Sequence, residues 1–84
     1  MLMLHVYNAS RSGDEAALRR WLARGESPDQ QGELGEPAIV AAAAQGHIGV
    51  LNALVEAGAS LEAATPRGFT ALLAAAEKGA EEVL

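Results

Sequence analysis

The chain of 84 residues contains no cysteine and only three aromatic residues, one each of Trp, Tyr and Phe. Without cysteine there is no disulfide framework, no thiolate nucleophile and no cysteine metal site. This composition fits a reducing compartment, and we expect a cytoplasmic protein. Half of the residues are apolar although few are aromatic. Alanine, rather than bulky side chains, must therefore supply much of the contact surface between closely packed helices.

Long apolar runs are also missing. The opening M-L-M-L-H-V-Y is apolar for about seven residues and has no leading positive charge, so it is neither a signal peptide nor a membrane span. We interpret it as the start of the first helix.

Positive charge is scarce, because six Lys and Arg residues stand against eleven acids, for a net charge of −5. Residues 1–25 hold four arginines and two acids (+2), whereas residues 26–84 hold two basic and nine acidic residues (−7). Nucleic-acid binding needs clustered Lys and Arg, and the acidic balance argues against it. The arginines near Trp21 favour a solvated outer helix face over membrane binding, because acids lead the same short helix.

Glycines are frequent and regularly placed. At an offset of 33 residues, Gly13 aligns with Gly46 and Gly79, while two further pairs bring seven of the nine glycines into one register. The further pairs are Gly25 with Gly58 and Gly35 with Gly68. Composition alone gives roughly 0.6 such pairs and the chain has four, so the spacing indicates a stack of repeated units.

Apolar positions follow the same period. The columns are Val6, Ile39 and Leu72; Leu18, Leu51 and Leu84; and Trp21 and Leu22 with Leu54 and Val55. An alanine-rich helix, a glycine, a second helix, a glycine and a turn-rich loop follow one another in residues 37–63, and residues 68–84 begin the same pattern again. This arrangement, with Gly46-His47, Gly58-Ala59 and Gly68-Phe69-Thr70, closely resembles the ankyrin repeat. The resemblance implies an all-α solenoid of stacked helix-turn-helix units joined by hairpin-like loops.

We expect one domain, residues 1–84, with units at about 4–36 and 37–69 and a partial unit at 70–84. Within them the pattern predicts helices at 4–12, from 14 to Gly25, from Pro37 to 45 and at 47–57. Asp14 is expected to cap the second helix. Unit three is expected to break at Gly79 and to begin a second helix at residues 80–84.

The chain departs from the ankyrin pattern in its loops. P-A-I-V and T-A-L-L replace the T-P-L-H corner, and Gly32 and Thr65 replace the loop aspartate. These loops are therefore expected to lack a side-chain acceptor for their backbone donors and to be mobile.

The partial third unit is expected to leave apolar side chains uncovered, namely Leu72, Leu73, Val83 and Leu84. Two and a half units are also fewer than a stable solenoid needs. We expect the chain to belong to a longer array, or to have this end covered by another chain.

Few residues of the sequence are candidates for catalysis or metal binding. His47 matches a structural glycine-histidine pair of the ankyrin pattern, and His5 has no partner at metal-ligand spacing. The acidic pairs, among them Glu33 with Glu36, suit helix ends and solubility, and no nucleophile motif surrounds any serine. We expect no catalytic residue, cofactor or metal.

The resemblance instead implies binding of another protein through loop tips and the exposed side of each first helix. Carried over to this sequence, the partner-binding residues are Glu33, Leu34, Glu36, Gln45, Arg67, Phe69, Glu77 and Lys78. Phe69 is the favoured anchor, the alternative being that it folds back onto Leu34 or a helix. Trp21 is expected to pack in the core rather than in an interface. The sequence thus predicts a noncatalytic interaction module with an acidic concave strip. The alternative is a structural segment that stacks on further repeats or self-associates through its uncovered end.

Overall fold

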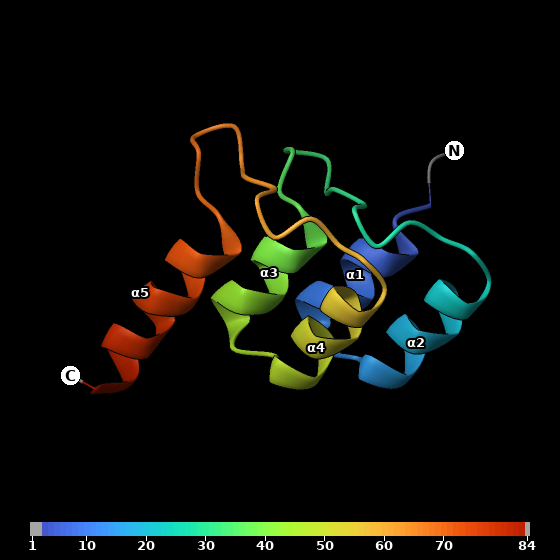
Figure 1. Cartoon of the computed structure of the whole chain (residues 1–84), viewed down its shortest axis with the longest axis horizontal. Helices are drawn as coiled ribbons and strands as arrows, with labels where there is room; N and C mark the ends of the chain where they lie inside the picture. Colours follow the sequence, from blue (N-terminus) through green and yellow to red (C-terminus); the bar gives the residue numbers. More distant parts are fainter. Residues whose placement is uncertain (1–2, 84) are drawn as a thin grey trace.

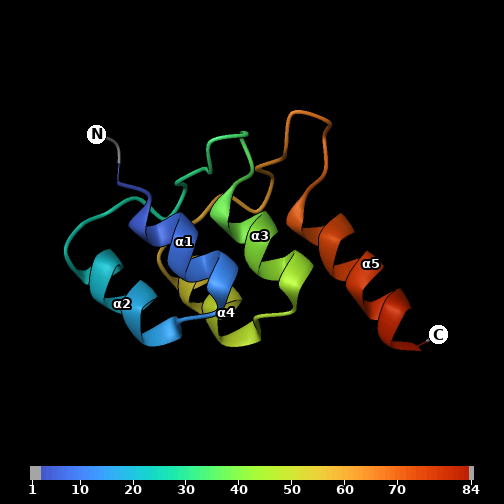
Figure 2. The ribbon, with the colours of Figure 1, turned by 180° about the vertical axis from the view of Figure 1, so that it is seen from behind.

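Five helices form two layers in the computed structural model, which describes residues 3–83 and the side chains of residues 3–80 (Figure 1). The helices are α1 (His5–Ser12), α2 (Glu15–Ala23), α3 (Ala38–Gln45), α4 (Ile48–Glu56) and α5 (Ala71–Val83). In one layer α3 packs between α1 and α5, and in the other α2 packs against α4. Figure 2 shows α1, α3 and α5 side by side from behind, with the loops along the edge of the stack where these helices begin. The fold is therefore all-α and layered, as the repeat predicts.

The predicted helix ends are confirmed in the first two helix pairs. Gly13 and Gly46 end α1 and α3 with φ of 80° and 74°, a left-handed conformation that costs glycine little. Asp14 caps α2 by accepting a hydrogen bond from the Ala17 backbone N–H at 3.0 Å. Pro37 takes the N-cap position of α3 with extended backbone, so the helix begins at Ala38, one residue later than predicted.

The predicted break at Gly79 is wrong. Helix α5 runs without interruption from Ala71 to Val83, and Gly79 has no positive φ. Gly13 and Gly46 are each followed by a helix that packs back onto the stack, whereas no helix beyond α5 is present in the described residues. Gly79 lies between Lys78 and Ala80 in a stretch of strong helix formers, so the backbone of unit three continues helically through it. Leu84 lies outside the described residues.

The core runs between the two layers. Its largest buried side chains include Val6, Leu18, Ile39, Val40 and Leu54. Alanines 41–43 and Ala74 are also buried, which confirms the prediction that alanine forms contact surface. For Ala75 and Ala76 this prediction is wrong, because both are exposed on the free side of α5.

The uncovered end of the stack is confirmed where side chains are described. Leu72 is 78% exposed and Leu73 is 50% exposed. The side chains of Val83 and Leu84 lie outside the described part of the chain.

The loops have more internal bonding than predicted. Thr65 Oγ1 accepts a hydrogen bond from the Phe69 backbone N–H at 3.1 Å, so this loop does have a side-chain acceptor. Asp29 Oδ1 accepts from the Ser60 backbone N–H at 2.8 Å and joins one loop to the next. The prediction that these turns lost their side-chain acceptors is therefore wrong for the second loop.

Candidate functional site

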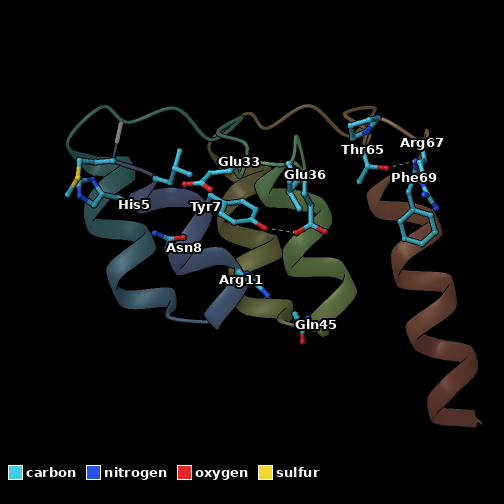
Figure 3. A pocket seen from close by; sticks show the side chains of 14 residues that line it. His5, Tyr7, Asn8, Arg11, Glu33, Glu36, Gln45, Thr65, Arg67 and Phe69 are labelled. Atoms are coloured by element: carbon cyan, nitrogen blue, oxygen red, sulfur yellow. Dashed lines mark hydrogen bonds between the residues drawn. The ribbon is translucent and has the colours of Figure 1, made fainter. Parts of the chain in front are cut away.

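An open groove of about 970 Å³ lies beside α1, beneath the tips of the two loops. Figure 3 shows its lining side chains projecting from α1 and from the loops. The lining residues are Met3, Leu4, His5, Tyr7, Asn8, Arg11, Glu33, Leu34, Glu36, Gln45, Thr65, Pro66, Arg67 and Phe69. Residues from the start of the chain, from α1, from the last residue of α3 and from two successive loops thus share one concave surface.

The structure brings six of the eight predicted partner-binding residues to this groove, and they are Glu33, Leu34, Glu36, Gln45, Arg67 and Phe69. Glu77 and Lys78 do not line it. They lie on the second turn of α5, where Glu77 is exposed and the Lys78 stem lies close to Gly46.

Tyr7 is the groove residue that sequence reasoning missed. Its hydroxyl donates a hydrogen bond to Glu36 Oε1 at 2.8 Å, and its backbone N–H donates to Gln30 Oε1 at 2.9 Å. The ring lies so close to Gly32 that a Cβ there would sit 2.5 Å from Tyr7 Cζ. The tyrosine therefore explains why the first loop has glycine where the ankyrin pattern has aspartate. The sequence did contain a signal for it: Tyr7 is the chain's only tyrosine, and the equivalent positions in the other units are the apolar Val40 and Leu73.

Burial raises the pKa of Tyr7 above its ordinary value of 10.0. Donation to Glu36 and the negative charge of that carboxylate raise the pKa further, while the positive charge of Arg11 lowers it. The neutral phenol is therefore the form that fits this site.

Phe69 combines the two roles that the sequence left open. Its ring is half-buried and packs against the core, yet it also lines the groove. Leu34, in contrast, projects from the first loop tip with 89% of its surface exposed. The groove therefore offers one anchored aromatic and one free aliphatic side chain.

The charge of the groove is balanced rather than acidic. Glu33 and Glu36 line it together with Arg11 and Arg67, and Figure 3 shows these four side chains along the same surface. The predicted acidic strip is therefore wrong for the groove that the structure forms.

A second polar cluster lies at the outer edge of α1 and α2. The His5 ring stacks on Trp21, with centroids 3.7 Å apart, and His5 Nδ1 lies 2.8 Å from Glu26 Oε2. The Arg24 guanidinium also lies over the Trp21 ring, with its carbon 5.2 Å from the ring centre. Trp21 packs against the core, as predicted, but only half-buried.

The remaining histidine has a structural contact. His47 Nε2 lies 3.1 Å from the Arg11 carbonyl oxygen and its ring fills the space beside Gly13, so it joins α4 to the end of α1. Among the described side chains of residues 3–80, no three His, Asp or Glu groups lie together in a way that could hold a metal ion. In the same residues no helix has both the length and the apolar character needed to cross a membrane.

The stacked helix pairs, the left-handed glycines and the groove under the loop tips define a helical repeat protein. A family model of ankyrin repeats, in three copies, matches residues 3–84, and the chain belongs to the ankyrin repeat family. The resemblance inferred from sequence is thereby confirmed. A comparison with curated proteins found no match. Ankyrin repeats are generally protein-protein interaction modules and generally noncatalytic.

Proposed function

We propose that this chain is a noncatalytic interaction module that binds a protein partner in the groove between α1 and the loop tips. The observation that supports this most directly is the convergence of six predicted contact residues on one open concave surface. A preformed groove loses little conformational freedom on binding, so modest contacts suffice for useful affinity. The cytoplasmic location stays a prediction from the cysteine-free composition.

The lining indicates the chemistry of the partner. Leu34 and Phe69 offer apolar contacts, while Glu33 and Arg67 offer charges of both signs at the loop tips. A partner segment with an apolar side chain flanked by basic and acidic groups would match this surface.

The test uses a photoreactive amino acid at position 34 and, as a matched control, at Ile48. Both side chains are large, apolar and exposed, but only Leu34 lines the groove. Cross-linking in cell extract should yield a protein adduct from position 34 and not from position 48. Replacement of Phe69 by Leu should weaken that adduct while circular dichroism stays unchanged. Equal adducts from both positions would show that the groove has no special role.

A second candidate function is assembly through the exposed face of α5. Leu72 and Leu73 favour it, because both are apolar and at least half exposed. Replacement of Leu73 by Asp should abolish any such assembly in sedimentation experiments and leave the cross-link from position 34 intact. Loss of both together would mean that the two surfaces do not act separately.

A further inference from the structure

Glu36 is an acidic residue of the groove whose side chain is held in place at one oxygen. Its Oε1 accepts a hydrogen bond from the Tyr7 hydroxyl at 2.8 Å, drawn as a dashed line in Figure 3. Its backbone is fixed as well, because its carbonyl oxygen accepts from the Gly32 N–H at 2.9 Å and the next residue, Pro37, is buried at the N-cap of α3. The carboxylate therefore has a set direction before any partner arrives, which lowers the entropy cost of binding.

The second oxygen of this carboxylate, Oε2, is open. Among the side chains of residues 3–80, no ion pair and no further side-chain hydrogen bond engages Glu36. Oε2 is not enclosed either, because the one buried oxygen without a partner in these side chains belongs to Glu26. Arg11 lies close enough for its charge to lower the pKa of Tyr7, yet it does not pair with Glu36. The groove thus presents a half-buried carboxylate with one oxygen bound and one available.

A cation is the group that such an oxygen attracts, because hydrogen bonds to ionised groups are about twice as strong as those between neutral groups. The two basic side chains of proteins differ here. Arginine binds a carboxylate best with two parallel N–H···O bonds, one to each oxygen, and the Tyr7 hydroxyl already occupies Oε1. Lysine has a compact ammonium group with three donors that need no common plane. It can donate to Oε2 and to the phenol oxygen, which keeps a lone pair after its own donation.

We propose that Glu36 receives a lysine side chain of the protein partner, and that Tyr7 is the positioning residue that makes this site prefer lysine over arginine. The inference rests on the proposed binding of a protein segment in the groove, and it adds the basic residue that the partner carries. Leu34 and Phe69 line the same groove, so the expected segment combines this lysine with an apolar side chain.

Peptides test this without knowledge of the natural partner. A random library of displayed peptides is selected on the wild-type chain, and the selected peptides are synthesised. Those kept form an adduct with the photoreactive residue at position 34 and not with that at position 48, so each one occupies the groove. Lysine should recur at one position among them.

That lysine is then replaced in each peptide by alanine or by arginine, and fluorescence anisotropy measures Kd. On the wild-type chain, alanine should weaken binding roughly tenfold, because a hydrogen bond between charged groups is lost. Arginine should weaken it roughly threefold, because the guanidinium cannot use both oxygens. This comparison needs no variant of the chain, so it decides the preference for lysine even if a variant fails to fold.

Three variants assign the roles, each checked for folding by circular dichroism. On Glu36→Gln, the lysine and alanine peptides should bind equally. On Tyr7→Phe, Oε1 is freed while the ring stays, so the arginine peptide should bind at least as tightly as the lysine peptide. A merely structural role of Tyr7 would weaken both peptides alike and leave their ratio unchanged. Glu33→Gln is the matched control, because Glu33 lines the groove without a bond to Tyr7, and it should keep both ratios.

The outcomes separate this inference from the proposed function. Groove peptides without a recurring lysine, or a preference for lysine that persists on Glu36→Gln, would overturn the inference and leave the groove as a binding site. An unchanged ratio of lysine to arginine binding on Tyr7→Phe would overturn the role of Tyr7. If no selected peptide distinguishes position 34 from position 48, the proposed function fails together with the inference.

Discussion

Helices α3 and α5 have matching sequences and opposite surroundings. Ile39 on α3 is 2% exposed, whereas Leu72, its equivalent on α5, is 78% exposed. The difference comes from the neighbours, because α3 contacts α1, α4 and α5 while α5 contacts α3. In a repeat stack, burial thus belongs to the position in the array and not to the residue in the repeat.

The largest effect is expected when the two equivalent residues, Ile39 and Leu72, are each truncated to alanine, which tests this comparison directly. Ile39→Ala should lower the free energy of unfolding by about 2–5 kcal/mol, because it leaves a cavity in the core. Leu72→Ala should change it by less than about 0.5 kcal/mol, because the side chain is already in water. Urea denaturation of both variants measures the difference. Similar losses would mean that Leu72 is covered in solution.

A second test uses the glycine column. Gly46→Ala should destabilise the chain by about 1–2 kcal/mol, because alanine is strained at a φ of 74°. Gly79→Ala should stabilise it by up to about 1 kcal/mol, because this glycine lies inside α5 with open space around it. Thermal melting should therefore move in opposite directions. A shift of the same sign for both would contradict the continuous α5.

The smallest expected effect concerns Tyr7, whose counterpart on α5 is the uncovered Leu73. Tyr7→Phe should cost about 0.5–1.5 kcal/mol through the lost bond to Glu36. Because the pKa of Tyr7 is raised in the folded chain, the stability that its phenol contributes is present below pH 10.0 and is lost as pH rises through the raised value.

Denaturation of the wild type and of Tyr7→Phe, near neutral pH and in alkali, measures this contribution. The advantage of the wild type should shrink in alkali. An absorbance titration of the single tyrosine should give a pKa above 10.0 in the folded state and near it in urea. An advantage that grew with pH would refute the assigned direction.

The sequence predicted the first four helices because their ends depend on local chemistry, such as the left-handed Gly13 and the capping carboxylate of Asp14. It misplaced the end of α5 because a glycine can either turn the chain or continue a helix, and the spacing does not distinguish Gly46, which has a φ of 74°, from Gly79, which lies inside α5. Tyr7 was missed for a different reason. Its role depends on Gly32 and Glu36, which reach it only after the loop folds over α1.

The bond between Asp29 and Ser60 has a consequence for sequence drift. The donor is a backbone N–H, so every residue except proline at position 60 supplies it. The acceptor is a side-chain oxygen, which at that length only aspartate or asparagine provides at position 29. The hydrogen bond therefore restricts only one of its two residues. Related chains can have many residue types at position 60 but few at position 29, and a library randomised at both positions should recover that difference.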